Sequence, residues 1–167
     1  MLARSDGVND QFVYMPSQQR VKRVSLRGEA VFGSDFSFED ILPREIEDAQ
    51  YQRLADERTL DRDCFVIEAI PQEHARSEYS RMVVHIDKER SIPLLTRYWN
   101  RREIEVKELR ADPASVELIE DVWIAKRMTM RHLKLETYTR LELASIEANA
   151  KLDDATFELR RLEARGR

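Results

Sequence analysis

The chain has 167 residues, of which 42% are hydrophobic, so one domain can bury a substantial core. Charged residues make up 36%, and acids exceed bases by four, which argues against the concentrated basic face that a nucleic-acid partner requires. The single cysteine, Cys64, excludes an internal disulfide, and no apolar run is long enough to predict a membrane-spanning helix.

The first predicted elements are the two strands of a hairpin. Residues 12–15 form an apolar run that ends at Pro16, and residues 21–26 follow after a polar turn. Residues 1–10 precede this pattern, lack the hydrophobic core of a secretory signal, and are expected to be disordered.

Residues 33–41, GSDFSFEDI, form the densest mixture of aromatic and acidic side chains in the chain. We call them the signature segment. Gly33 allows a sharp turn at little steric cost. Phe36 and Phe38 are predicted to be buried, so the segment is expected to pack against the strands and not to form a loose surface loop.

The carboxylates of the signature segment have two interpretations. Asp35, Glu39 and Asp40 could form an acid–base pair or a cation site, but no further ligands follow at a recognisable spacing. The alternative is a short helix capped by Ser34 or Asp35, with the acids near its positive end. We favour caps and solvated charges.

Period-two alternation dominates the rest of the chain and predicts an antiparallel meander of roughly nine strands. Residues 43–48 are expected to be irregular or one helical turn, residues 51–60 could be strand or helix, and residues 135–165 stay open between strand and helix. The clearer strands are 64–70, 79–86, 93–99, 104–109, 116–119, 122–133 and 137–143.

Catalytic and metal-binding motifs are not found in the sequence. His74, His85 and His132 lie far apart, belong to no metal-spaced motif, and are interpreted as surface or satisfied residues, with His85 on the polar face of its strand. Cys64 lies in an apolar run and is interpreted as a small core residue. We therefore expect no catalytic residue, no metal and no cofactor.

One face of the predicted meander is apolar, and the opposite face is charged. Such an apolar face is either ordinary core or a surface that helices, a partner or a ligand must cover, and flexible methionines suit variable acyl chains. The apolar positions are Phe65, Ile67, Met82, Val84, Ile86, Leu94, Thr96, Tyr98, Met128 and Met130. The opposite positions are Glu68, Arg81, His85, Asp87, Arg97, Glu105, Lys107, Arg127 and Arg131.

Several segments together, over about residues 12–163, resemble the LolA-like family of outer-membrane lipoprotein-sorting proteins. The departures are mild: His85 replaces an aromatic residue, Asn100 an aspartate and Ala125 a proline. The matching segments are the signature segment (with Gly33, Asp35, Phe36, Phe38 and Asp40), Tyr14–Pro16 with 20–24, 79–88 with 92–94, Val122–Trp123, 128–130, 137–143, and Asn149, Leu152, Asp153, Phe157 and Leu162.

The resemblance implies a mainly β fold, an incomplete antiparallel half-barrel with few short helices and a concave apolar side. It also implies strands to about residue 148, a periplasmic location and a signature segment that braces one rim of the sheet. Family members typically begin with a signal peptide, a helix and early strands, so residues 1–167 are expected to be a single, N-terminally truncated LolA-like domain.

The predicted function is non-catalytic binding and transport of lipid or lipoprotein acyl chains in outer-membrane lipoprotein sorting, with the ten apolar positions as the binding face. One alternative is a protein-interaction module, accessory to an RND-type exporter, that docks through the sheet face or edge. Unpaired strand edges would also allow a homodimer. A second alternative is a hydrolase that uses Asp35, Glu39 or a histidine.

Overall fold

The computed structural model describes residues 2–3, 11–15, 18–24, 28–147, 149–158 and 160–161. The chain divides into two compact units, one formed by residues 1–27 with 149–167 and the other by residues 28–148. The single-domain assignment stays a prediction. The disorder expected for residues 1–10 falls outside the described residues, except at Leu2–Ala3, which form strand β1.

The first unit contains a small antiparallel sheet in the order β1-β2-β3. Strand β2 (Gln11–Met15) pairs with β3 (Arg20–Val24), which confirms the predicted hairpin. The 3-10 helix η5 (Asp154–Phe157) belongs to the same unit.

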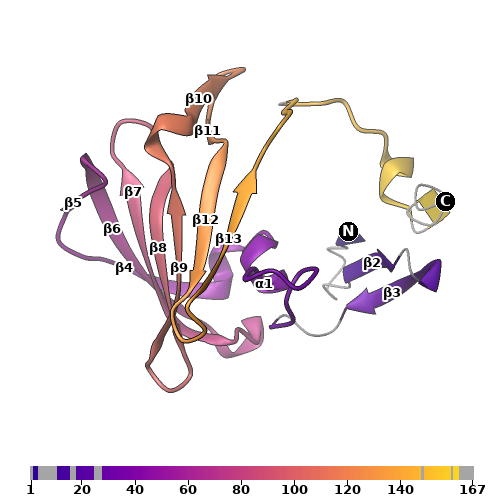
Figure 1. Cartoon of the computed structure of the whole chain (residues 1–167), viewed down its shortest axis with the longest axis horizontal. Coiled ribbons are helices and arrows are strands. Elements are labelled where there is room, and N and C mark those ends of the chain that lie inside the picture. The colour runs from indigo at the N-terminus through magenta and orange to yellow at the C-terminus, as the bar shows by residue number, and fades with distance from the viewer. Residues whose placement is uncertain are drawn as a thin grey trace. The chain divides into compact units, whose positions relative to one another are not determined.

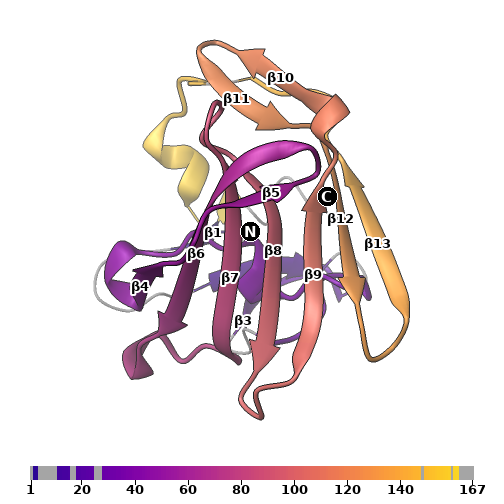
Figure 2. The same cartoon turned by 90° about the vertical axis from the view of Figure 1, so that its left-hand side faces the viewer.

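The second unit is built on an eight-stranded antiparallel sheet with the path β13-β12-β9-β8-β7-β6-β4, and β5 also pairs with β6 (Figure 2). In the part of the chain that the structure describes, this sheet is not closed into a barrel, as predicted. Its strands are β4 (Ala49–Arg53), β5 (Glu57–Thr59), β6 (Arg62–Pro71), β7 (Tyr79–Asp87), β8 (Pro93–Asn100), β9 (Glu105–Ala111), β12 (Arg127–His132) and β13 (Thr137–Glu142).

Strands β10 (Val116–Ile119) and β11 (Val122–Ala125) form a separate hairpin. The single strand predicted over residues 122–133 therefore divides at Lys126, because β11 pairs with β10 while β12 pairs with β9 and β13. The sequence left residues 51–60 and 135–165 open between strand and helix. In the structure, β4 and β5 lie in the first range, and β13 lies at the start of the second.

Helices are few and short, as predicted. The described residues include no helix long and apolar enough to cross a membrane. The helices of the second unit are α1 (Phe38–Ile41) and the 3-10 turns η2 (Ile46–Asp48), η3 (Glu73–Ala75) and η4 (Pro113–Ser115).

The signature segment follows a tight turn at Val31–Ser34. Phe32 and Gly33 both have positive φ, 51° and 74°, and the Ser34 N–H donates to the Val31 carbonyl at 3.0 Å, the pattern of a type I′ turn. The sharp turn predicted from Gly33 is confirmed. The predicted helix cap was wrong, because Ser37 is the N-cap of α1.

Two hydrophobic clusters make up the core of the second unit. Phe36 is 7% exposed and Phe38 8%, so the predicted burial of both rings is confirmed. Figure 1 shows α1 beside one face of the sheet, where Phe36 forms the first cluster with Ala69, Tyr79, Met82, Tyr98 and Met130. The second cluster contains Cys64, Ile92, Leu94 and Ala111, with Leu60, Val116, Trp123, Ala125 and Met128 packed against it.

Candidate functional site

The strand register tests which predicted apolar residues share a face of the sheet, because directly paired residues point to the same side. Ile67 pairs with Val84, and Val84 pairs with Thr96. Parallel rows join Phe65 to Ile86, Met82 to Tyr98, and Leu109 to Met130. Met128 pairs with Ala111, two residues from Leu109 on the same face. Of the ten positions, therefore, only Leu94 lies off the rows, at a bulge of β8.

More than half of this face is already covered by the protein itself. Met82, Tyr98 and Met130 are at most 4% exposed and pack in the cluster around Phe36. Thr96 is also buried. Leu94 belongs to the second cluster, and the partly buried Met128 packs against it, as does Trp123 of the β10–β11 hairpin. Five of these positions are therefore core residues in this structure, and Met128 packs at the edge of the core.

The other four predicted residues remain partly exposed and adjoin one another. Phe65, Ile67, Val84 and Ile86 occupy two neighbouring rows of β6 and β7, and we call them the apolar block. Two residues further along the same strands, Ala69 and Met82 enter the cluster around Phe36. The apolar block is thus the part of the predicted binding face that the described residues leave open to a ligand.

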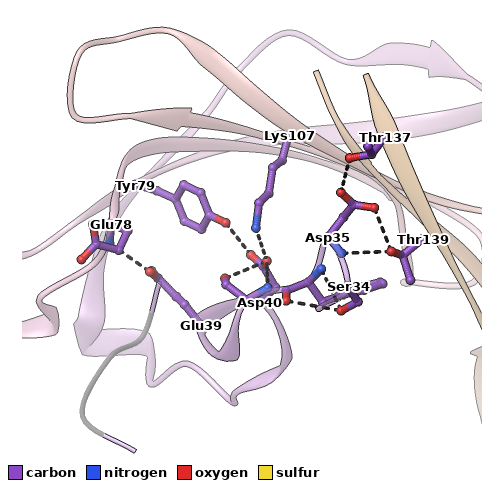
Figure 3. Close-up of polar contacts among 11 residues, drawn as sticks. Ser34, Asp35, Glu39, Asp40, Glu78, Tyr79, Lys107, Thr137 and Thr139 are labelled. Atoms are coloured by element: carbon purple, nitrogen blue, oxygen red, sulfur yellow. Dashed lines mark hydrogen bonds and ion pairs between the residues drawn. The ribbon is translucent and has the colours of Figure 1, made fainter. Parts of the chain in front are cut away.

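The signature segment is attached to the far edge of the sheet through Asp35. The hydroxyls of Thr137 and Thr139 on β13 both donate to the Asp35 carboxylate, and the Asp35 N–H donates to the Thr139 Oγ1 at 2.9 Å (Figure 3). Burial alone would raise the pKa of Asp35, but the two threonine hydrogen bonds outweigh it and hold this pKa below its ordinary value.

Asp40 is the most heavily bonded carboxylate of the segment, and its side chain is fully buried. It accepts hydrogen bonds from the N–H and hydroxyl of Ser37 at 2.7 and 2.8 Å and from the Tyr79 hydroxyl at 2.7 Å (Figure 3). Lys107 Nζ lies 2.9 Å from Oδ2, and the Lys107 side chain is only 12% exposed. Burial and the Asp40 charge together raise the pKa of Tyr79, so this phenol stays a protonated donor.

Glu39 makes a third attachment, at the start of β7. It is 3% exposed, and it accepts hydrogen bonds from the Ser77 hydroxyl and from the Glu78 N–H at 2.9 Å. The segment is therefore fixed to β7, β9 and β13, which fits the predicted brace.

Two expectations about charge were wrong. Glu39 and Asp40 are buried and not solvated, because strand and turn donors replace water at their oxygens. Lys107 was assigned to the opposite, charged face but points toward Asp40. A bulge between Tyr98 and Trp99 disturbs the period-two count in β9, and Val106 packs on the covered side as well.

The opposite face is less solvated than expected. His85 is 3% exposed, and its Nδ1 lies 2.8 Å from the Thr59 hydroxyl, so it is a satisfied histidine. Burial lowers the pKa of His85, which favours the neutral ring. Asp87 is 1% exposed and is bonded by Arg62 at 2.9 Å.

The contacts of the three carboxylates in the signature segment do not favour a catalytic role. Both oxygens of Asp35, Glu39 and Asp40 are held by groups that attach the segment to the sheet. Within the described residues, no group of three or more His, Cys, Asp or Glu side chains could hold a metal ion. The hydrogen-bonding partner of His85 is Thr59, which lies outside the signature segment.

The comparisons with known proteins agree with this architecture. A family model described as "Uncharacterized protein" matches residues 1–164. The chain is 29% identical, with a TM-score of 0.86, to a solved domain of Vibrio parahaemolyticus that is provisionally described as an outer membrane lipoprotein-sorting protein domain. The chain belongs to this LolA-like family.

Two further solved structures are similar to this LolA-like protein. A DUF1329 family protein of Desulfovibrio piger has 25% identity and a TM-score of 0.87. A LolA superfamily protein of Nitrosomonas europaea has 20% identity and a TM-score of 0.70, and supports the fold alone. The chain aligns over 94%, 94% and 89% of its length but spans only about two thirds, 67%, 66% and 66%, of the three solved chains. The comparison with curated proteins gave no match.

Sequence reasoning missed the partners of the signature segment. Thr137 and Thr139 were used only as evidence for a strand, although their spacing of two puts both hydroxyls on one face. No sequence pattern marks Lys107 or Tyr79 as a partner of Asp40, because the contacts between them form only in the folded sheet.

Removal of the buried cation should destabilise the LolA-like fold strongly. We expect Lys107→Met to lower the free energy of unfolding by about 3 kcal/mol, because it leaves the Asp40 carboxylate buried without a compensating charge. Chemical denaturation measures this. Lys126→Met is the matched control, since Lys126 pairs with Glu117 at the surface and such pairs contribute about 0–1 kcal/mol. Equal effects of the two substitutions would contradict the buried pair.

The Asp35 attachment should be sensitive to acid. The folded pKa of Asp35 lies below its ordinary value of 3.8, so the stabilisation by Asp35 is fully present above the unfolded pKa and is lost as pH falls through the folded pKa. The difference in unfolding free energy between the wild type and Asp35→Asn should therefore shrink below about pH 4. The double variant Thr137→Val/Thr139→Val should lose stability relative to the wild type with the same pH dependence. A loss of stability that does not depend on pH would refute the bonding of the Asp35 carboxylate by the two threonines.

Proposed function

We propose that the protein is a non-catalytic carrier that binds acyl chains on the apolar block, in outer-membrane lipoprotein sorting in the periplasm. The observation that carries the proposal is the open block on a sheet face that is otherwise covered. The resemblance to a lipoprotein-sorting domain supports it, as does the attachment of the signature segment, which keeps the covered part of the face closed.

The size of the block sets the strength of binding. Two rows on two strands span about 7 Å along the strands and about 5 Å across them, enough for about five methylene groups. At about 0.8 kcal/mol for each buried methylene, the block alone supplies about 4 kcal/mol, or millimolar affinity. Tighter retention requires a longer contact along the face, and the weak local contact lets a partner or membrane take the cargo.

A pair of isoleucines on the same strand tests the binding face. Ile67 lies in the apolar block, whereas Ile70 is 45% exposed three positions further along β6, on the other face of the sheet. We expect Ile67→Gln to weaken binding of a fluorescent acyl probe about fivefold to tenfold, because a polar amide replaces buried hydrocarbon. Ile70→Gln should leave the affinity unchanged.

Thermal melts of both variants separate loss of binding from loss of folding. Equal affinities of the Ile67 and Ile70 variants would rule out the apolar block as the site. Native mass spectrometry of the purified wild type that never shows bound lipid, together with no binding of acylated peptides, would rule out the carrier function.

The edge of the sheet supports a second candidate, in which β13 pairs with a strand of a protein partner or of a second copy. Strand β13 ends the sheet path, and Tyr138 and Leu141 on it are 66% and 37% exposed. Unpaired edges favour such pairing, and a charge on the edge opposes it. Light scattering should then show concentration-dependent dimers that Leu141→Lys abolishes. A monomer at every concentration would exclude the homodimer.

A further inference from the structure

The apolar block ends at a pair of cations. The guanidinium Cζ of Arg53 lies 4.6 Å from the centroid of the Phe65 ring, and the Nζ of Lys88 lies 5.3 Å from the same centroid. Their side chains are 57% and 36% exposed. Both charges are therefore held over an aromatic ring of the block while they stay within reach of a ligand.

A single carboxylate connects the two cations. Asp56 Oδ1 lies 2.8 Å from the Arg53 guanidinium, and Asp56 Oδ2 lies 2.7 Å from Lys88 Nζ. These contacts hold the pKa of Asp56 below its ordinary value, with Lys88 the larger cause and Arg53 the next, so Asp56 stays anionic. Two cations and one anion leave one positive charge uncompensated.

The neighbouring acids make their contacts outside this group of three. Glu57 lies 3.9 Å from the neutral His85 ring, and Glu89 shares the Arg62 guanidinium with Asp87. The contact group of Arg53, Lys88 and Asp56 carries one net positive charge and lies beside the Phe65 ring, where the apolar block meets polar groups. The negative head of an amphiphile would complement this group.

We propose that the cargo is an amphiphile with an anionic headgroup, a phosphate or a carboxylate, whose acyl chain lies on the apolar block while Arg53 and Lys88 hold the headgroup. The inference rests on the proposed function, because it names the cargo class of the same site. Arg53 supplies a planar fork that suits two oxygens, and Lys88 a point charge that follows the headgroup. An added anion would balance the two cations against two negative charges.

A pair of probes with the same chain isolates the headgroup. Titration of the whole chain with cis-parinaric acid and with its methyl ester, at pH 8 and low salt, compares a carboxylate with a neutral head. We expect the wild type to bind the acid about fivefold more tightly than the ester, as exposed ion pairs allow. Arg53→Gln/Lys88→Gln should lose this preference and keep its affinity for the ester.

Two further variants complete the design. Asp56→Asn removes the competing carboxylate and should increase the preference for the acid. Arg131→Gln/Arg140→Gln is the matched control, because it also removes two exposed arginine charges, on β12 and β13, and should preserve the preference. Melting temperatures establish that every variant folds.

The outcomes separate the two proposals. Equal binding of acid and ester by the wild type, or loss of preference in the control variant, would overturn the anionic cargo and leave the carrier function standing. Binding of neither probe would overturn the carrier function itself. Displacement of parinarate by inorganic phosphate at the concentration at which decanoate displaces it would indicate a site for free anions, and would also overturn the inference.

Discussion

The buried carboxylate of Asp40 is the interaction on which the rest of the second unit depends. A carboxylate out of water requires both charge and hydrogen-bond compensation, and four donors meet it: the N–H and hydroxyl of Ser37, the Tyr79 hydroxyl and Lys107 Nζ. These donors come from the signature segment, β7 and β9. Because few other arrangements would satisfy all of them, the segment has one place on the sheet, and Phe36 is brought into the first cluster.

That placement divides one sheet face into a covered and an open part. The hydrogen bonds of Asp35 to β13 and of Glu39 to the residues before β7 hold both ends of the segment in place around Asp40. The cover therefore ends at the row of Ala69 and Met82, and the apolar block begins at the next row. Binding at the block does not require the buried ion pair to break, which allows a carrier to exchange cargo while its fold stays intact.

The two ends of the proposed site use charge in opposite ways. At the covered end, Lys107 and Asp40 are out of water and compensate each other, so the pair specifies position. At the open end, Arg53 and Lys88 share one carboxylate in water, so their charge remains available to a ligand. Burial, more than residue type, distinguishes the structural cation Lys107 from the two cations that we propose to bind a headgroup.

The sequence by itself determined the strand meander, the sharp turn at Gly33 and the burial of Phe36, because alternation, glycine conformation and aromatic hydrophobicity act locally. It also determined the family, since the order of several segments is a property of the chain alone. Only the tertiary structure decided the role of Lys107, because a bulge shifts the side-chain alternation in a way that local pattern does not show. It also decided which apolar residues are core and which are open, because this depends on contacts such as Asp35 with Thr139, 104 positions apart, that bring the cover onto the sheet.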